Sequence, residues 1–483
     1  MIRGSLSIKS WSVSGFRIML IRISLSTIFL ALSTLLGSCA TTTAPDLKHL
    51  YAIGKDSQHA MTVAEQPPVI LIHGVLGARL RNKNTGKEVW PAGMGSILFN
   101  NYEDAALSID PETLKPSPSP LEAYAITSSA AGKDYYGEII RTLANVGGYI
   151  PGTPGEAALD KQPRYYIYYY DWRQDNVQSA RQLGDLIEQI RSDYGNPKLK
   201  VDIVAHSMGG LITRYFMRYG YVDVLDDNEF PVNNYGSSRV RRVVLLGTPN
   251  LGSVSAIQGF LQGYKVGLRS IPTEVLVTMP SAYQLFPHPI HDSLILADGR
   301  VLDRDLFDIE IWRAFEWSIF DPKVRQRILS RFDDADTGER HLALLERYFN
   351  KHIERARRFV WSLTVPGADA SVRYVVFGAD CELTPTRMLV EEVNGESVLR
   401  LHPERIKNRI SGVDYENLML EPGDGRVTRA SLFARTSLDP RILRHKYSAF
   451  NMDHSILLCE SHDSLTGNIS FQNNLLNILL TRD

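Results

Sequence analysis

The sequence has few cysteines and almost no net charge. Its 483 residues include only three cysteines, and 53 basic residues nearly balance 54 acidic ones. Three cysteines are too few to build a disulfide scaffold, and they form no closely spaced pairs that could hold a zinc ion. A net charge of −1 provides no basic field for the phosphates of a nucleic acid. We therefore expect no nucleic-acid partner, and nothing in the sequence predicts a metal ion or a cofactor.

The overall composition is that of an ordinary globular protein. Hydrophobic residues make up 44% of the chain and charged residues 22%, which excludes a disordered, collagen-like or multi-span membrane protein. The length corresponds to about three domains of roughly 150 residues each. This estimate is only approximate, because α/β enzymes with inserted segments often form a single domain that is much longer than 150 residues.

Acidic residues are absent from the first 45 positions, which carry four basic residues instead. The apolar run at 23–36 is short and rich in Ser and Thr for a membrane span. A basic start, a short apolar run and small residues after it predict a secretory signal. The run ends in Leu36-Gly37-Ser38-Cys39, which resembles the lipobox of bacterial lipoproteins. The resemblance implies that residues 1–38 are removed and that Cys39 is acylated; the alternative is a plain signal or a short anchor.

Removal of the signal would leave a mildly acidic protein on a lipid anchor. Without residues 1–38 the chain has 49 basic and 54 acidic residues, a net charge of −5. No basic patch lies beside Cys39, so association with a membrane would come from N-terminal acyl chains. Residues 39–66 are polar and predict a tether. We expect a lipoprotein of the bacterial cell envelope, at the outer membrane or a periplasm-facing surface.

From residue 67 onwards, short apolar runs alternate with stretches of helical spacing. Runs rich in β-branched and aromatic residues predict buried strands at 69–72, 165–170, 201–205, 240–246 and 373–377. Helical spacing occurs at 136–146, 180–194 and 211–219. This alternation predicts an α/β fold with a mostly parallel sheet that helices cover on both faces. Such sheets place their chemistry at the carboxyl ends of the strands.

Two segments do not fit a minimal sheet. Residues 252–290 mix four glycines with apolar side chains such as Phe260 and Leu276, which predicts either a mobile apolar lid or an irregular core loop. Residues 301–358 hold 24 charged residues among 58, and their apolar residues share one helical stripe. This pattern predicts a helical cap inserted into a single catalytic body over residues 67–483. The stripe consists of Leu342, Leu345, Tyr348, Phe349, Ile353 and Ala356.

The strongest chemical signal is a serine at 207, between a predicted strand and a predicted helix. The segment Ala205-His206-Ser207-Met208-Gly209-Gly210 resembles the nucleophile elbow of α/β-hydrolases, with Ala205 in place of the usual first glycine. Small residues flank the serine because the turn is strained and the following helix packs closely. An ordinary helix N-cap serine is the alternative. The flanking strand, helix and glycines favour a nucleophile.

A serine nucleophile needs a histidine base and an acid that orients the base. In α/β-hydrolases the acid and then the histidine follow the serine along the chain. We predict His454 as the base, with His445 and His462 as rivals. For the acid we favour Asp424, because glycines on both sides let a turn present its carboxylate. Asp380 is the rival acid, since it follows a predicted strand.

Negative charge that develops on a substrate oxygen needs backbone donors placed in advance. One predicted donor is the N–H of Met208, directly after the nucleophile. The other belongs to the loop after the first predicted strand, His73-Gly74-Val75-Leu76-Gly77, where we expect the Val75 N–H to donate.

Together these motifs resemble the lecithin:cholesterol acyltransferase family of α/β-hydrolases. The matches occur in the family's order from about residue 67 to the C-terminus, and Tyr-Asp-Trp-Arg is the most specific of them. They are residues 68–77, Tyr170-Asp171-Trp172-Arg173, Ala205 to Gly209, 246–253, 377–387, Gly423 to Val427 and the segment of His454.

The resemblance implies Ser207, Asp424 and His454 as the triad, Val75 and Met208 as oxyanion donors, and a lid and a cap. The sequence departs from the family at His73, Ala205 and Arg426, where relatives often have Pro, Gly and Thr. Arg426 beside the acid bears on how Asp424 is oriented. Cys381 and Cys459 do not clearly match the family's disulfide positions, and the sequence leaves a bridge between them open.

The sequence thus predicts acyl transfer through a covalent acyl-serine on a lipid ester at a membrane surface. Transfer to water makes a phospholipase or lipase, and transfer to an acceptor alcohol makes an acyltransferase. Both share every catalytic residue. Two alternatives stay open: a serine esterase or amidase for non-lipid substrates with the same triad, and a catalytically silent lipid-binding lipoprotein.

Overall fold

The computed structural model describes most of the chain after residue 59. The described residues are 46–47, 60–91, 102–127, 129–130, 133–160, 162–266, 269–365, 372–434 and 452–482. The predicted signal, Cys39 and most of the predicted tether lie outside them. The chain divides into two compact units, Met1–Asp46 and Leu47–Asp483, and the second contains the fold described below.

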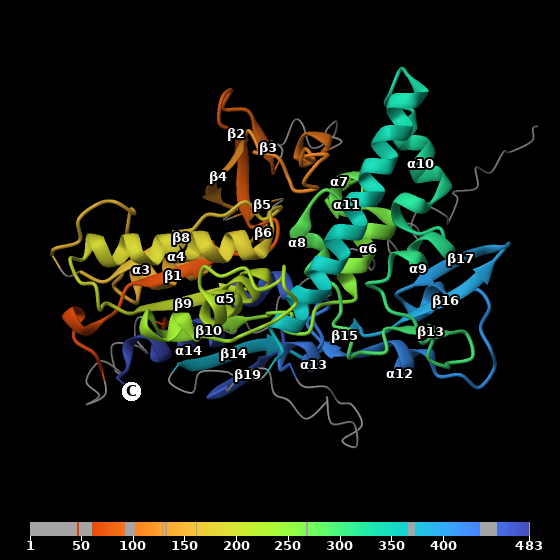
Figure 1. Ribbon diagram of the computed structural model, residues 1–483. Helices are drawn as coiled ribbons and strands as arrows, with labels where there is room; N and C mark the ends of the chain where they lie inside the picture. The colour runs from red at the N-terminus through yellow and green to blue at the C-terminus, as the bar shows by residue number, and fades with distance from the viewer. Residues whose placement is uncertain are drawn as a thin grey trace, which may run out of the picture. The chain divides into compact units, whose positions relative to one another are not determined.

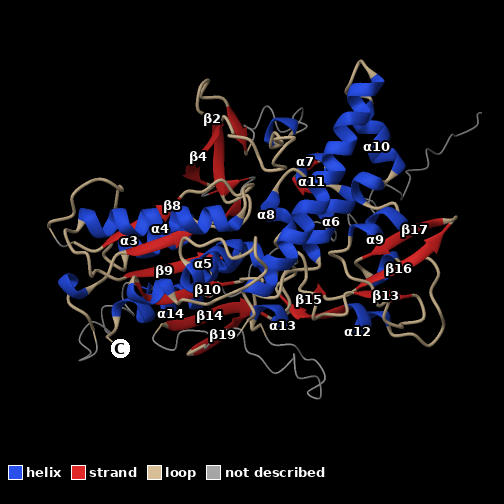
Figure 2. Ribbon diagram, in the orientation of Figure 1, coloured by secondary structure: helices blue, strands red, loops and turns tan. Residues whose placement is uncertain are grey.

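Seven strands form a central sheet in which every neighbouring pair is parallel. Figures 1 and 2 show the sheet among its helices. This arrangement confirms the predicted α/β fold. In order across the sheet, the strands are β19 (His454–Leu458), β14 (Arg373–Ala379), β10 (Val240–Leu246), β9 (Val201–His206), β1 (Val69–Ile72), β8 (Arg164–Tyr168) and β7 (Ile150–Pro151).

Helices cover both faces of this sheet. Successive strand residues point to opposite faces, so Ile70 and Ile72 of β1 enter one apolar cluster, whereas Val69 and Leu71 enter the other. Side chains of α4 (Asn176–Asp193) and α5 (Met208–Tyr219) complete the first cluster. Those of α3 (Gly137–Asn145) and α14 (Ile469–Leu480) complete the second. The strands that lie between the two clusters are nearly continuous apolar runs for this reason.

The region predicted as a helical cap follows β13 (Leu294–Leu296) in sequence and lies at the right of Figure 1. Its helices are α9 (Ile309–Ala314), α10 (Pro322–Leu329) and α11 (Ala335–Ser362). The apolar stripe predicted between Leu342 and Ala356 is buried along α11. Since the opposite face of α11 carries charged side chains, the helix packs on one side only, as its spacing predicts.

Residues 252–290 pack mostly as core. Phe260, Val275, Tyr283 and Phe286 are each at most 1% exposed, so the structure favours the core-loop alternative for most of this segment. The hairpin of β11 (Tyr264–Val266) and β12 (Arg269–Ile271) is the more exposed part. The helices here are α6 (Ser255–Gln262), α7 (Thr273–Leu276) and α8 (Pro280–Tyr283).

Smaller sheets and short helices complete the described fold. The sheets join β2 (Ala78–Asn82), β3 (Glu88–Trp90) and β4 (Leu121–Ile126); β5 (Ser129–Ala130) and β6 (Lys133–Asp134); β13 (Leu294–Leu296), β16 (Met388–Val393) and β17 (Glu396–Arg400); and β15 (Glu382–Pro385) and β18 (Leu420–Gly423). The short helices are α12 (Tyr415–Met419), α13 (Arg429–Leu432), η1 (Val63–Glu65), η2 (Glu103–Ala105), η3 (Tyr235–Ser238), η4 (Ser318–Phe320), η5 (Pro403–Arg405) and η7 (His462–Gly467).

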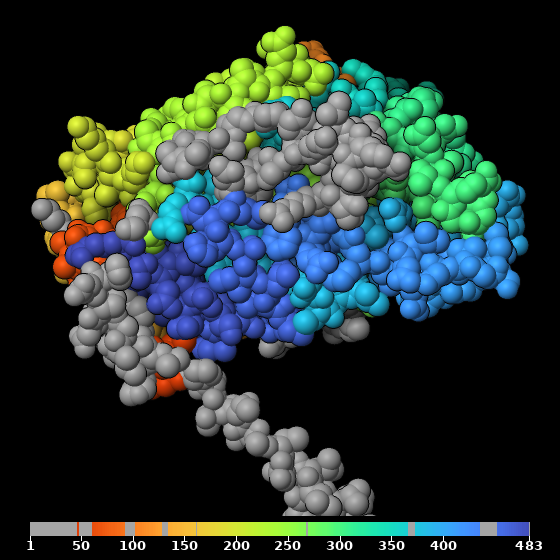
Figure 3. Space-filling model, turned by 90° about the horizontal axis from the view of Figure 1, so that it is seen from below, coloured from red at the N-terminus to blue at the C-terminus, as the bar shows by residue number. Residues whose placement is uncertain are grey.

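The start and the end of the described fold lie side by side. Ala60 forms a bridge with Thr481, and the Met61 N–H donates to the Leu480 carbonyl at 2.9 Å. Figure 3 shows this neighbourhood, where the orange-red start of the chain meets its dark blue end. Within the residues that the structure describes, no helix has the length and apolar character needed to cross a membrane.

A disulfide joins Cys381 and Cys459, the pair that the sequence left open. The two cysteines follow β14 and β19, which are neighbours in the sheet. The bridge closes a segment with a sequence separation of 78 residues, and this segment contains Asp424.

Loss of this bridge is expected to destabilise the fold. A cross-link restricts the unfolded chain, so the C381S/C459S variant should lose about 2 to 5 kcal/mol of unfolding free energy. Denaturant titration of the oxidised wild type, the reduced wild type and the variant measures the effect. Reduced wild type should match the variant, whereas equal midpoints for all three would contradict the prediction.

Candidate active site

Ser207 lies at the sharp turn between β9 and α5. Its backbone angles are φ 53° and ψ −125°, a conformation that is strained for a residue with a side chain. The glycines after it allow the turn to pack, because a Cβ on Gly209 would lie 2.6 Å from the His73 carbonyl oxygen. A Cβ on Gly210 would overlap the Thr248 side chain. The local geometry is that of the predicted elbow.

Asp424, His462 and Ser207 form one hydrogen-bonded chain. Nδ1 of His462 lies 2.8 Å from Oδ2 of Asp424, and Nε2 lies 3.0 Å from Oγ of Ser207. All three residues are buried, with exposures of 2%, 6% and 7%. Since a carboxylate only accepts, Nδ1 carries the proton and Nε2 presents its lone pair to the serine hydroxyl.

The structure does not bring His454 to this site, so the predicted position of the histidine is wrong. His454 is the exposed first residue of β19, where it pairs with Val375. Ser207 follows the carboxyl end of β9. The register aligns His454, through Val375 of β14 and Val244 of β10, with Val204 of β9, three residues before Ser207. In addition, β19 is three strands away from β9, roughly 14 Å at a spacing of about 4.8 Å between neighbouring strands.

The histidine in the site is His462, one of the two rivals from the sequence. It begins η7, after β19 ends at Leu458 and before α14. The signal that could have found it is the apolar run from Ile456 to Leu458, which marks the last strand and places a later histidine at the carboxyl edge. His445 lies outside the described residues.

Asp424 is held in the turn between β18 and α13. Its Oδ1 accepts the N–H groups of Val427 at 2.7 Å and Arg426 at 3.0 Å. Burial by itself would raise the pKa of this carboxyl, but the charge and hydrogen bond of His462 and the two N–H donors outweigh burial and lower the pKa. The rival acid, Asp380, instead lies 3.6 Å from Arg429 in an ion pair.

The loop from His73 to Gly77, here called the oxyanion loop, lies directly against Ser207. A Cβ on Gly74 would sit 2.8 Å from Cβ of Ser207, which brings the neighbouring Val75 to the same side of the turn. Val75 is half-buried against the core. Met208 is the first residue of α5, where a backbone N–H has no acceptor within the helix. Met208 thus directly follows Ser207, and Val75 follows the glycine that contacts it; donation by their two N–H groups stays a prediction.

The Tyr-Asp-Trp-Arg segment, residues 170–173, holds this loop through hydrogen bonds to its backbone and the residue after it. The Tyr170 hydroxyl donates to the His73 carbonyl at 2.8 Å, and the Trp172 indole donates to the Ala78 carbonyl at 3.0 Å. Tyr170 also stacks on the His73 ring at 4.1 Å. The fully buried Arg173 pairs with both carboxylate oxygens of Asp171, at 2.8 and 2.7 Å. These bonds fix the backbone on both sides of the oxyanion loop.

The side chain of Arg426 points away from the acid that its N–H holds. Its guanidinium lies 3.6 Å from the Asp463 carboxylate and faces the ring of Tyr264 on the β11–β12 hairpin at 5.7 Å. Ser253 donates to the Arg426 carbonyl. The departure from the family at this position therefore leaves the orientation of Asp424 intact.

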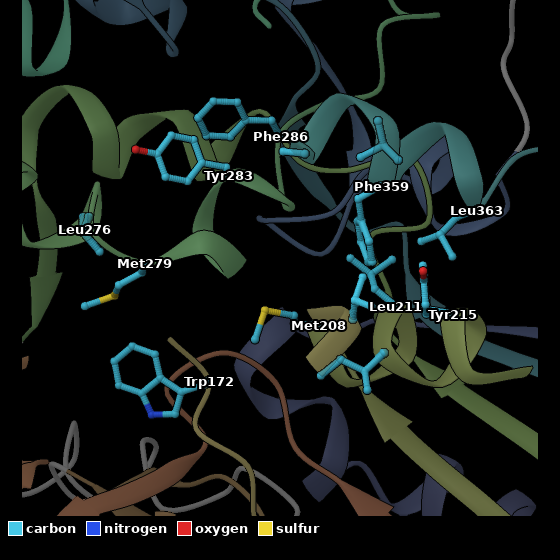
Figure 4. Close-up of a cluster of buried hydrophobic side chains, with 14 of the residues drawn as sticks. Trp172, Met208, Leu211, Tyr215, Leu276, Met279, Tyr283, Phe286, Phe359 and Leu363 are labelled. Atoms are coloured by element: carbon cyan, nitrogen blue, oxygen red, sulfur yellow. The ribbon is translucent and has the colours of Figure 1, made fainter. Parts of the chain in front are cut away.

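Apolar side chains surround the residue after the nucleophile. Figure 4 shows Met208 between Trp172 and Met279 on one side and Leu211 and Phe359 on the other. All five belong to one buried cluster that unites the sheet, residues 272–286 and the cap helix α11. The side chain of Met208 thus packs into the core that joins the sheet to the cap region.

A cavity of about 390 Å³ lies elsewhere, between α11 and the segments at 225–226 and 307–309. None of the triad residues lines it. Charged side chains that line it form ion pairs with one another and with residues elsewhere in the fold. Arg355, for example, forms ion pairs with Asp175 at 2.7 Å and Asp223 at 2.8 Å. Because the hydrogen-bonded triad lies outside this cavity, we assign the chemistry to Ser207 instead.

Comparison with known proteins supports the fold and the family resemblance. The family model of lecithin:cholesterol acyltransferase matches residues 127–305, which contain the Tyr-Asp-Trp-Arg, elbow and 246–253 motifs. A chain in the crystal structure of the Tle4–Tli4 complex is similar at 18% identity, 86% coverage of this chain, 98% coverage of that chain and a TM-score of 0.54. The mature Bacillus licheniformis lipase BlEst2 gives 12% identity, 88% and 95% coverage and a TM-score of 0.31.

The sheet order, the strained serine turn and the family match over residues 127–305 agree with the resemblance found in the motifs. The chain therefore has an α/β-hydrolase fold and resembles the lecithin:cholesterol acyltransferase family over residues 127–305.

Proposed function

We propose that this protein is a serine-dependent lipid acyl hydrolase or acyltransferase that works through an acyl-serine. The observation that carries the proposal is the continuous chain from the Asp424 carboxylate through His462 to Ser207 Oγ, with links of 2.8 and 3.0 Å. Buried nucleophile–base–acid chains of this geometry activate a hydroxyl that is otherwise a weak nucleophile. The family match supports lipid esters as the substrate class.

In the first half of the reaction, Ser207 Oγ attacks the ester carbonyl while His462 Nε2 takes the hydroxyl proton. The Asp424 carboxylate stabilises the imidazolium that forms. The N–H groups of Val75 and Met208 donate to the carbonyl oxygen as it gains negative charge. His462 then protonates the leaving alcohol, and the acyl group stays on Ser207.

In the second half, His462 deprotonates water or an acceptor alcohol, which attacks the acyl-serine and restores the hydroxyl. Water gives a phospholipase or lipase, and an alcohol gives an acyltransferase. A non-lipid serine esterase or amidase and a silent lipid-binding protein are the competing hypotheses.

The Ser207→Ala variant should lose at least about 10³-fold in turnover, because the nucleophile is removed. The assay incubates purified wild type and variant with a phospholipid labelled in its acyl chain, with and without an acceptor alcohol. Free fatty acid alone would assign a hydrolase, and a new labelled ester would assign a transferase.

Other outcomes separate the competing hypotheses. Unchanged turnover in Ser207→Ala would remove the serine mechanism. A wild type that cleaves soluble p-nitrophenyl acetate but no lipid would favour the non-lipid esterase, and a wild type inactive on both would favour the silent protein.

A matched pair of histidine variants tests the base. His462→Asn should lower kcat by about 10³-fold or more, because Ser207 loses its proton acceptor. His454→Asn should stay within twofold of wild type, since this exposed side chain lies at the far edge of the sheet. Steady-state kinetics on one ester decides between them, and the reverse pattern would contradict the assignment.

We also propose that the protein is an envelope lipoprotein, anchored by acyl chains on Cys39. The lipobox-like sequence Leu36 to Cys39 supports this proposal. Cys39→Ser should move the protein from the membrane to the soluble fraction, because stable anchoring depends on the acyl chains. Fractionation of cells expressing each form, followed by immunoblotting, measures the distribution; full membrane retention of the variant would exclude this anchor.

A further inference from the structure

Two buried side chains beside the triad have no role in the proton transfer above. Tyr136 directly precedes α3, and His206 is the last residue of β9. They are 3% and 8% exposed, so their polar atoms depend on partners within the protein. Their rings meet edge to face, with centroids 5.6 Å apart.

The Tyr136 hydroxyl joins the oxyanion loop to His206. The Gly74 N–H donates to Oη of Tyr136 at 2.9 Å, and the same Oη lies 2.8 Å from Nδ1 of His206. Because a backbone N–H can only donate, Oη accepts there. The His462 carbonyl beside Nε2 of His206 can only accept, so Nε2 carries the proton of the neutral ring and the Tyr136 hydroxyl proton is directed to Nδ1. Nδ1 of His206 is therefore an acceptor.

His206 continues the chain of bonds to the catalytic histidine. With Nδ1 accepting, the neutral ring carries its proton on Nε2, which lies 3.3 Å from the His462 carbonyl oxygen. The pKa of His206 is lowered to about 3, mainly by burial and also by the charge of His462, although Asp463, the bond to the His462 carbonyl and Asp424 each raise it. The neutral ring needed for this arrangement is thus the stable form.

The backbone of His462 is held on both sides as a result. Its N–H donates to the Asp424 carbonyl at 2.9 Å, and its carbonyl accepts from His206. At the other end of the chain, Gly74 touches Ser207 and precedes the proposed donor Val75. The hydrogen bonds from Gly74 through Tyr136 and His206 to His462, here called the relay, therefore connect the oxyanion loop with the residue that receives the proton.

We propose that Tyr136 and His206 are positioning residues that hold the oxyanion loop and His462 in register across the nucleophile. This inference rests on the serine mechanism proposed above. Neither side chain touches the reacting atoms. Their contribution is preorganisation, since donors and base must be in place before charge develops.

Tyr136→Phe removes one oxygen and keeps the ring, so it tests the relay with little change in packing. Turnover of a p-nitrophenyl ester and the rate of inactivation by a fluorophosphonate, which phosphonylates Ser207 and expels fluoride, should each fall about 10- to 100-fold. KM should stay within twofold, because the relay does not contact the substrate.

Tyr168→Phe is the matched control. Tyr168 is also buried, and its hydroxyl donates to the Ser179 carbonyl at 2.6 Å between β8 and α4. Its loss should lower the melting temperature to a similar extent while kcat stays within twofold of wild type. The control thus separates a lost buried hydrogen bond from a lost relay.

Variants of His206 test the second half of the relay. The amides of His206→Asn and His206→Gln can replace the bonds near Nδ1 and near Nε2, respectively, so each should retain more kcat than His206→Phe. Tyr136→Phe and His206→Phe share one hydrogen bond, and their combined loss should be smaller than the product of the single losses.

A Tyr136→Phe enzyme with kcat and inactivation rate within twofold of wild type would overturn the proposal, and so would a fully multiplicative double variant. Ser207→Ala distinguishes this failure from failure of the mechanism itself. If Ser207→Ala is inactive while Tyr136→Phe behaves as wild type, only the relay is wrong. If Ser207→Ala retains turnover, the serine mechanism is wrong.

Discussion

The placement of one imidazole between a buried carboxylate and a strained serine is the constraint on which this structure depends. The three groups come from positions up to 255 residues apart in sequence, and their links tolerate only a few tenths of an ångström. No single contact can provide that precision. The parallel sheet brings Ser207 and the segments of Asp424 and His462 to one edge, and the disulfide between Cys381 and Cys459 ties the acid-bearing segment to the last two strands.

The elements that the sequence predicted well are those whose chemistry is local. The elbow needs a strand, a tight turn and two glycines within ten residues, so Ser207 could be found from its neighbours alone. Asp424 is similar, because the glycines beside it are needed for the turn that presents the carboxylate. The apolar stripe of α11 is also a local periodic signal, and it is buried as its spacing predicts.

The histidine could not be found in the same way, because its position depends on where the last strand begins. His454 has a suitable local sequence, but it is the first residue of the edge strand β19, level with Val204 of β9 and three strands away from it. The lid shows a related difficulty. Glycines among apolar residues at 252–290 are compatible with a flap or with core, and only packing against the cap and α5 separates the two. Long-range partners, not local propensity, decide such cases.

The junction of Ala60 with Thr481 limits how the protein can present its site to a lipid surface. Arg241, at the start of β10, contacts Met61 and the Leu479 carbonyl, so the chain enters the fold at the amino edge of the sheet, opposite Ser207. Any connection that reaches Ala60 therefore arrives on the side of the sheet away from the nucleophile.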